Sequence, residues 1–382
     1  MRRRQPGGAR WAALARHGLL GLAGLTLHLS PACAAAAGQT PGPATPAATG
    51  AAGSTTPADG AALIKRLQES ARLRSYTGTY VVSSAGAMSS ARIVHAWDGS
   101  NQIERIESLD GQKRRVFRHN DAVHILWPAS RSASIEPSGS LRGFPATPAA
   151  DASSLEMYEL LPGADDRIAG HDAHTVTLRP RDNARFMQRW WLDRGSGLLL
   201  RADVVSERGD VLESAAFSEL QLGARVQAQA LLAEMNRLEG YRVSRNRVVP
   251  TDLEREGWVL RSLVAGFRPV HCVQRMANDG PSRQAASSAG QTPGLAAGSL
   301  ADAGASAGGN TVLQVIYSDG LTHVSIFIEA YRPDIHVPEP VIAMGATHAL
   351  VRRLGEWWIT VVGDVPPATL RHFALALERR KP

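Results

Sequence analysis

The clearest alternation of apolar and polar positions lies between Gln314 and Glu329. In its second half Val324, Ile326 and Ile328 occupy every other position, which is the period of a half-buried β-strand. The preceding Ser318-Asp319-Gly320 is typical of a turn, because Asp and Gly tolerate the positive φ that a tight hairpin loop needs. The pattern therefore predicts a β-hairpin.

A second block of period-2 segments lies about 200 residues upstream, a separation that favours two β-rich domains. Its segments are short and are joined by turn residues such as Asp110-Gly111, which favours antiparallel pairing. We expect a mainly β, α+β fold: an unclosed antiparallel half-barrel with packed helices, followed by a smaller β-sheet and helix domain. The expected strands of the first block lie at 76–82, 93–95, 103–106, 116–117, 123–127, 175–178, 185–192, 198–206 and 211–220.

Helical periodicity is confined to short segments. Leu63, Ile64 and Leu67 fall on one face of a helix predicted over 61–72, with Asp59 as its cap. Residues 130–148 show no period and are expected to be irregular. Further helices are predicted at 155–161, at 227–235 and from Pro366 onward, and further strands at 258–260, 266–273, 347–354 and 356–362.

Composition sets the expected domain boundaries. A polar, small-residue segment cannot offset its ordering entropy, so residues 38–58 and the insertion 277–310 are expected to be disordered. The expected order is a signal peptide at 1–37, a linker at 38–58, a first domain at 59–222, an interdomain linker at 223–250 and a second domain at 251–382.

The first 37 residues have the layout of a secretory signal peptide. Five arginines precede an apolar stretch from Gly18 to Leu29, and Pro31 to Ala37 supplies small residues for cleavage. The apolar stretch is too short for a comfortable membrane span. A lipoprotein signal, with Cys33 as the lipidated residue, is the alternative. Export, with the signal removed, is therefore expected.

Export changes what charge and cysteine content imply. The whole chain carries a net charge of +7, but losing the five leader arginines leaves the mature chain close to neutral. The basic balance is therefore no argument for nucleic-acid binding, which needs basic groups gathered on one face. Cleavage also removes Cys33, so that Cys272 stands alone and no internal disulfide is expected.

The search for catalytic chemistry is negative. The chain has no G-x-S-x-G, C-x-x-C, H-E-x-x-H or P-loop motif. His171 and His174 are three residues apart, which places their rings on opposite faces of a strand and argues against a metal pair. Cys272 has no identifiable base beside it, and Asp319 is most simply a turn residue. We expect a protein that is not an enzyme and has no cofactor or metal.

The large apolar side chains in the predicted strands of the first domain say more about function. An unclosed half-barrel leaves its inner face open, and large apolar side chains on that face could accept an acyl chain. Ordinary sheet core is the alternative for these side chains. The candidates for lipid binding are Tyr76, Tyr80, Ile93, Trp97, Trp127 and Trp190.

Arginines in the same strands could ring the mouth of such a groove and pair with lipid phosphates. Solvated surface positions are the alternative for them. The group comprises Arg92, Arg105, Arg114, Arg115 and Arg118, of which Arg92 and Arg115 are taken as the candidate lipid contacts.

An ordered set of motifs resembles the MucB/RseB family, over roughly 63–376 and interrupted by the insertion at 277–310. No single motif is decisive, and the order of the whole set behind a signal peptide carries the resemblance. The motifs are Tyr76-Thr-Gly-Thr-Tyr-Val-Val82, Ala91-Arg-Ile-Val-His95, Glu107-Ser-Leu-Asp-Gly111, Trp190-Trp191-Leu-Asp193, Gly257-Trp-Val-Leu260, Gly266-Phe267, Tyr317-Ser-Asp-Gly320, Val324-Ser-Ile-Phe-Ile-Glu329 and Gly345-Ala-Thr-His348.

The resemblance implies a periplasmic negative regulator of the sigma-E envelope stress response. Its first domain would have the fold of periplasmic lipoprotein carriers. The protein would bind the periplasmic domain of a membrane-anchored anti-sigma factor of the RseA/MucA kind, protect it from proteolysis, and be released by lipid or lipopolysaccharide. The hairpin gives the clearest match in the second domain, so the expected partner contacts are Tyr317, Asp319, Leu321, Phe327 and Glu329.

Two other functions stay open at this point. A periplasmic lipoprotein or lipid carrier would use the same groove, although a carrier needs only the first domain. A secreted hydrolase would need a cluster of histidine, carboxylate and nucleophile, which the sequence does not offer. The oligomeric state is open as well, with a homodimer among the alternatives, and no nucleic-acid partner is expected.

Overall fold

A computed structural model describes residues 57–120, 122–137, 152–245, 248–276, 311–334, 336 and 342–380. All of them lie in one compact unit, 51–382. The predicted signal peptide, nearly all of the linker at 38–58 and the insertion at 277–310 fall outside the described residues. Within the described ranges no helix is both long and apolar enough to cross a bilayer.

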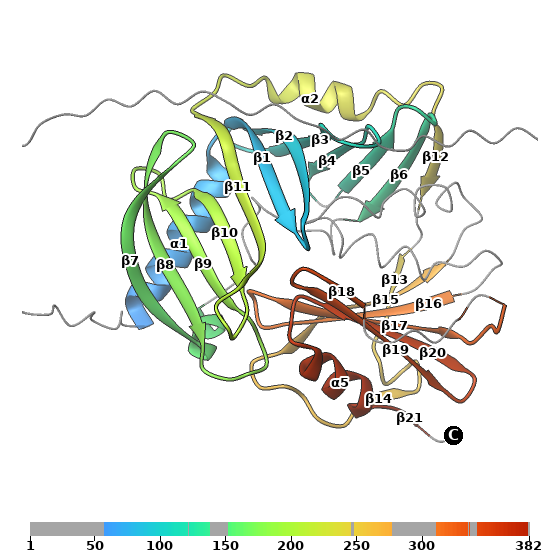
Figure 1. Cartoon of the computed structure of the whole chain (residues 1–382). Coiled ribbons are helices and arrows are strands. Elements are labelled where there is room, and N and C mark those ends of the chain that lie inside the picture. Colours follow the sequence, from blue (N-terminus) through green and yellow to red (C-terminus); the bar gives the residue numbers. More distant parts are fainter. Residues whose placement is uncertain are drawn as a thin grey trace, which may run out of the picture. The chain divides into compact units, whose positions relative to one another are not determined.

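The first of two large sheets has twelve strands in the order β12-β6-β5-β4-β3-β2-β1-β11-β10-β9-β8-β7 (Figure 1). Every pair is antiparallel except β12 with β6. The end strands, β12 and β7, do not pair with each other, so the expected unclosed antiparallel sheet is confirmed. The strands are β1 Tyr76–Ser84, β2 Ala87–Trp97, β3 Gln102–Ser108, β4 Arg115–His119, β5 Ala122–Trp127, β6 Ser132–Pro137, β7 Tyr158–Ile168, β8 His171–Pro180, β9 Met187–Asp193, β10 Leu199–Val205, β11 Val211–Leu222 and β12 Arg242–Arg245.

Local sequence explains the hairpin of β1 and β2. Alternate residues of β1 from Tyr76 to Ser84 are buried, as period-2 patterning requires. The two turn residues, Ala85 and Gly86, have φ of 51° and 77°. Two successive positive φ values fit the right-handed twist of the flanking strands, which is why this short loop closes the hairpin.

Two helices cover opposite faces of this sheet (Figure 1). Helix α1, Pro57–Leu73, packs Ile64 and Leu67 into a cluster with β7–β10. Helix α2, Ala228–Met235, packs Leu231 and Met235 into a cluster with β2–β6. Glu234 of α2 also forms ion pairs with arginines of β3 and β4, so this helix is held by charge as well as by burial.

The second sheet has seven strands in the order β13-β15-β16-β17-β20-β19-β18 (Figure 1). Helix α5, Pro367–Ala376, buries Leu370 and Phe373 completely against it. The predicted hairpin is confirmed as β16 and β17. The strands are β13 Val248–Pro250, β15 Arg268–Met276, β16 Thr311–Ser318, β17 His323–Ala330, β18 Ile342–Met344, β19 Thr347–Leu354 and β20 Trp357–Gly363, and a separate pair joins β14 Trp258–Leu260 to β21 Leu377–Arg379.

Three local predictions were wrong. Asp59 does not cap α1, because the helix already begins at Pro57. Residues 132–137, expected to be irregular, form β6, because both β5 and β12 pair with them. The helix predicted at 155–161 is a short 3-10 turn, Ala152–Met157, followed by β7, since Tyr158–Pro162 pairs with β8.

The segment 223–250 between the sheets has structure of its own. It contains α2, which agrees with the helix predicted at 227–235. Its end segments β12 and β13 each join one of the two large sheets. The segment therefore contributes a strand to each sheet as well as connecting them.

Candidate functional site

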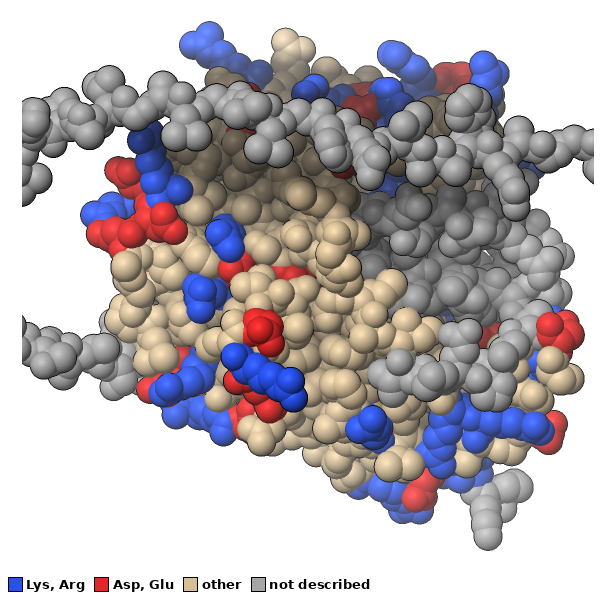
Figure 2. Space-filling view, in the orientation of Figure 1, with Lys and Arg blue, Asp and Glu red and all other residues tan. Residues whose placement is uncertain are grey.

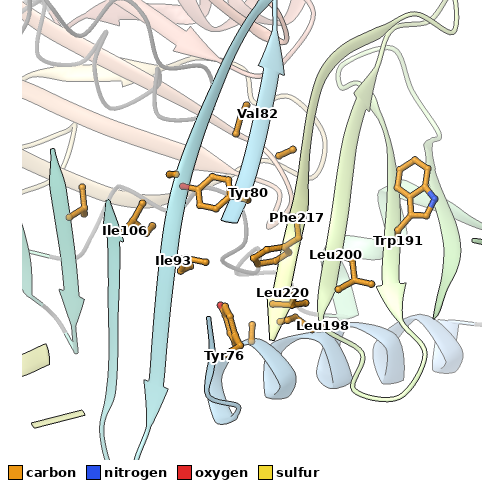
Figure 3. Close-up of a cluster of buried hydrophobic side chains, with 14 of the residues drawn as sticks. Tyr76, Tyr80, Val82, Ile93, Ile106, Trp191, Leu198, Leu200, Phe217 and Leu220 are labelled. Atoms are coloured by element: carbon orange, nitrogen blue, oxygen red, sulfur yellow. The ribbon is translucent and has the colours of Figure 1, made fainter. Parts of the chain in front are cut away.

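One face of the twelve-stranded sheet carries a continuous apolar row across five strands. Cα pairing places Gly78 opposite Ile93, then Ile106, Val116 and Ile125 in turn. Residues directly opposite each other in a sheet share a face, so the four large side chains form one stripe, here called the apolar row. Figure 3 shows Ile93 and Ile106 of this row next to the tyrosines of β1.

Polar or aromatic rows flank the apolar row on both sides. On one side Tyr76 lies opposite His95, which lies opposite Glu104, and Glu104 lies opposite Arg118. The Tyr76 and His95 rings are stacked, with centroids 4.8 Å apart and planes 12° apart. On the other side Tyr80 lies opposite Ala91. This face therefore combines an apolar stripe with polar side chains at its edges.

The six predicted apolar residues all lie on this face. Tyr76, Tyr80 and Ile93 are buried in one cluster with Phe217, as Figure 3 shows. By strand alternation Trp97 and Trp127 share the face, and both are half-buried.

Trp190 reaches the same face through the pairing of Ala202 with Ala215 and of Ala215 with Val82. It packs in the cluster under α1 rather than among the tyrosines. The face is thus continuous from β9 to β5, while Trp190 belongs to the part that α1 covers.

The two predicted arginines lie on the opposite face. Arg92 alternates with Ile93 and is exposed. Arg115 alternates with Val116, and its guanidinium lies 3.2 Å from Glu107 and 3.3 Å from Glu234 of α2. The structure therefore gives Arg115 carboxylate partners beneath α2 and does not bring either arginine to the apolar row.

Arg118 of β4 lies on the face of the apolar row, and Arg114 immediately precedes that strand. Arg118 donates to the buried Glu104 at 2.5 Å. Arg114 is half-buried beside Tyr80, and burial lowers the pKa of its guanidinium. Burial also raises the pKa of Tyr80 to about 12, so that this phenol keeps its proton at neutral pH.

The predicted partner-contact residues of the hairpin are mostly buried. Tyr317 is in the core of the second sheet, and Phe327 is in a smaller cluster on the other side of it. Leu321 is half-buried against the α1 cluster of the first sheet. Glu329 is 1% exposed, and burial raises its pKa to about 7.

Asp319 connects the hairpin turn to the first sheet. Its Oδ1 accepts hydrogen bonds from the backbone N–H groups of Leu321 and Thr322, which fixes the turn. Its Oδ2 accepts from the Tyr158 hydroxyl at 2.9 Å and from Arg185 Nη1 at 3.0 Å. The Asp319 and Arg185 side chains are both 0% exposed. A buried, hydrogen-bonded ion pair thus joins segments 134 residues apart.

Arg185 is enclosed by further contacts. Its Nη2 donates to the Ala265 carbonyl at 2.5 Å, and its Nε lies 3.2 Å from Asp182. The guanidinium also lies over the Phe267 ring, 5.1 Å from the centroid. Gly266 is required here, because a Cβ would lie 2.6 Å from Met157 Cγ. We call Asp319, Arg185 and Tyr158 the junction triad.

A second junction lies at the turn between β18 and β19. A Cβ on Gly345 would overlap Ser84 Oγ and lie 2.8 Å from the Leu212 carbonyl, so only glycine fits against β1 and β11. Nearby, burial and then the charge of Asp364 raise the pKa of Glu213 to about 7.

Sequence reasoning missed the junction triad, and it did not separate Arg114 from Arg115. Arg185 and Asp319 are too far apart in the chain for any local pattern to pair them. Arg114 was grouped with Arg115, but strand alternation with Val116 separates the two faces and could have distinguished them.

The described residues offer little for catalysis. No cluster of three or more metal-ligating side chains occurs among them. Burial raises the pKa of the Cys272 thiol to about 11, which keeps it protonated and weakly nucleophilic. On the face shown in Figure 2 basic and acidic side chains of the described residues are interspersed, without the single-sign patch that nucleic-acid binding requires.

Comparison with known proteins gives consistent matches over both sheets. A profile of the MucB/RseB N-terminal domain matches residues 59–235, and one of the MucB/RseB C-terminal domain matches residues 252–378. The sigma factor AlgU regulatory protein MucB of Pseudomonas aeruginosa is 26% identical over 335 residues, which is 85% of this chain and 92% of that protein. The sigma-E factor regulatory protein RseB of Haemophilus influenzae is 22% identical, over 80% of this chain and 86% of that protein.

Solved structures extend the similarity to the fold. The complex of Pseudomonas aeruginosa MucA and MucB contains a chain that superposes with a TM-score of 0.60 at 23% identity, covering 85% of this chain and 100% of that one. A crystal structure of MucB alone gives a TM-score of 0.57 at 22% identity, over 85% of this chain and 98% of that one. The two-sheet fold is therefore shared with MucB.

Proposed function

This chain belongs to the MucB/RseB family, and we propose that it is a periplasmic regulator that restrains the sigma-E envelope stress response. It binds the periplasmic part of a membrane-anchored anti-sigma factor and protects it from proteolysis. The observation that carries the proposal is the match to one family in both domains, together with relatives named as sigma-factor regulatory proteins that align over most of this chain.

Lipid or lipopolysaccharide releases the complex in this proposal. The apolar row and the aromatic side chains around it are the proposed contacts for acyl chains. Ile93, Ile106 and Val116 are at most 5% exposed, so an acyl chain reaches them only by displacing the side chains that cover this face. An exported protein meets such lipids in the envelope, where mislocalised outer-membrane components signal damage.

The release mechanism is linkage between two ligands. If lipid favours an arrangement that the anti-sigma segment disfavours, each ligand weakens the other by the same factor. The junction triad is suited to carry this coupling, because it ties the hairpin turn of the second sheet to Tyr158 of β7 and to Arg185, which precedes β9. The segment 223–250, which contributes a strand to each sheet, is the hinge.

A pull-down with protease protection tests the proposal. The purified mature chain, used as bait in a periplasmic extract, is expected to capture an anti-sigma factor and to slow its cleavage by the site-1 protease. Capture of mature lipoproteins with no anti-sigma factor would contradict the proposal and favour the carrier function. Capture without any slowing of cleavage would reject the protective role.

A further inference from the structure

Within the described ranges, the strands at the ends of the two large sheets differ in how they are protected. An edge strand offers unpaired backbone N–H and C=O groups, and proteins block such edges with charged residues or proline. In the first sheet β7 carries Pro162, Asp165 and Asp166, and β12 begins and ends with arginine. In the second sheet β13 ends with Pro250, whereas β18, Ile342-Ala-Met344, has neither a charge nor a proline.

The free backbone groups of β18 lie at Ala343. Met344 and Thr347 flank a two-residue turn, and such a flanking pair is the hydrogen-bonded pair that closes the hairpin. The next pair, Ala343 with His348, is therefore a non-hydrogen-bonded one, so the N–H and C=O of Ala343 point away from β19. No strand of the described chain pairs with that side of β18. The edge is also accessible, because Ala343 is exposed and Ile342 is 38% exposed.

The first sheet adds exposed apolar side chains beside β18. The turn after β18 packs Gly345 so closely on Ser84 of β1 and on the Leu212 carbonyl of β11 that a Cβ would overlap Ser84. Along the chain Met88 and Val211 lie within four residues of that contact, and they are 70% and 50% exposed. Apolar groups of both sheets are thus accessible around one contact.

We call Ile342, Ala343, Met88 and Val211 the junction edge. An unprotected edge with apolar side chains beside it is suited to pair with an extended peptide. The hairpin residues that the sequence offered as partner contacts are mostly buried, so a partner needs another surface. Release by linkage also needs a partner whose affinity depends on how the two sheets are arranged. The junction edge meets both requirements.

We propose that an extended apolar segment of the anti-sigma factor's periplasmic domain adds to β18 as a further strand and covers Met88 and Val211. This inference rests on the proposed function and specifies where its protein partner binds. Ala343 supplies main-chain hydrogen bonds, and the apolar side chains around it select the segment. Because the segment contacts both sheets, a change in their junction alters its affinity.

Calorimetric titration of the full mature chain with the anti-sigma periplasmic domain captured in the pull-down tests this. A lysine at the edge opposes strand addition, because its charge loses water when the segment binds. Ile342→Lys is expected to weaken binding about tenfold or more, and Met88→Lys about fivefold or more, since each also removes an apolar contact. Val249→Lys is the matched control: Val249 is 42% exposed on β13, the opposite edge of the same sheet, and we expect less than about a twofold change. Urea unfolding checks that the three variants keep the stability of the wild type.

The possible results separate this inference from the proposed function. Failure of the wild-type chain to bind an anti-sigma domain would reject the proposed function itself, whereas unchanged affinity in Ile342→Lys would reject strand addition at β18 alone. A loss with Ile342→Lys but not with Met88→Lys would reject a segment that spans both sheets. An equal loss with Val249→Lys would show a general effect of added charge and overturn the assignment. A wild-type dimer that Ile342→Lys converts to a monomer, with anti-sigma affinity kept, would assign the edge to a second copy of this chain.

Discussion

Asp319 makes four of the hydrogen bonds that determine how the hairpin turn is held. Two of them close the turn, and the other two come from Tyr158 and Arg185 in the first half of the chain. Such a residue has to be both buried and charged, which is stable only because every oxygen has a donor. Its Ser-Asp-Gly context is sufficient to predict a turn, but nothing local indicates that a guanidinium from 134 residues upstream completes it.

Replacing Asp319 with Asn should destabilise the fold strongly. The substitution leaves the Arg185 charge buried without its main partner, and we expect a loss of about 3 kcal/mol in the free energy of unfolding, measured by urea titration. Asp182→Asn is the matched control: it touches the same guanidinium, but its side chain is 30% exposed, so we expect a loss of about 1 kcal/mol or less. Similar losses for the two variants would contradict the assigned role of Asp319.

Glu213 gives the molecule a pH dependence of defined sign. Burial and the charge of Asp364 raise its pKa from 4.5 to about 7. Between these values the folded protein binds a proton that the unfolded chain has released, so the contribution of this group to stability falls as pH rises and levels off above pH 7.

Glu213→Gln should remove that dependence. Each pKa unit corresponds to about 1.4 kcal/mol, and we expect the variant to be about 1–3 kcal/mol more stable than wild type at pH 8, with little difference near pH 4.5. Urea unfolding of both proteins at several pH values measures this difference in stability. Glu219→Gln, an exposed position on the same strand, should leave the pH profile unchanged. A wild-type profile that rises between pH 5 and 7 in parallel with that of Glu213→Gln would contradict the account.

At the level of elements, strands whose own pattern is period-2 were predictable, and strands that depend on a distant partner were not. In β1 and in the hairpin of β16 and β17, the alternation of apolar and polar residues is enough to predict the strands. β12 has the sequence Arg-Val-Ser-Arg and becomes a strand by pairing in parallel with β6, about a hundred residues upstream. β7 begins with Tyr-Glu-Leu-Leu, a sequence that is also compatible with a helix. It forms a strand because it pairs with β8, with Leu160 opposite Leu178. Such pairings are non-local, so composition alone cannot fix them.

In the candidate site, too, some features could be predicted from the sequence and others could not. The apolar residues could be assigned to one face from alternation alone, because Tyr76, Tyr80 and Ile93 follow the strand period. The partners of the arginines could not, since Glu234 lies on a helix far along the chain. The ion-pair partner of a charged strand residue lies on the element that packs over that strand. Which element this is can be known only from the fold.

The turn between β18 and β19 offers a test of contact between elements. Gly345 and Gly355 flank β19 with nearly equal φ, 62° and 61°, so alanine is strained similarly at both. Gly345 is crowded by Ser84 and Leu212, whereas at Gly355 no atom of the described residues lies within 4 Å of the position that a Cβ would take.

We expect Gly355→Ala to cost about 1 kcal/mol and Gly345→Ala at least about 1–2 kcal/mol more, because the turn has to move away from β1 and β11. Thermal or urea unfolding of the two single variants measures the difference. Equal costs would show that the turn does not press on the first sheet in solution.

At the scale of the whole molecule, the two sheets share a buried ion pair and a glycine contact rather than a flexible linker alone. A ligand on the first sheet can therefore bias the position of the hairpin in the second by altering these contacts. In the proposed lipid-released regulator, the two binding events would compete through these contacts.

Affinity for the periplasmic domain of the anti-sigma factor, measured by calorimetry with and without saturating lysophosphatidylglycerol, tests this claim most directly. The account predicts that lipid lowers the affinity about five-fold or more, and that the anti-sigma domain lowers lipid affinity by the same factor. An affinity that lipid leaves unchanged, with lipid shown to be bound, would contradict it.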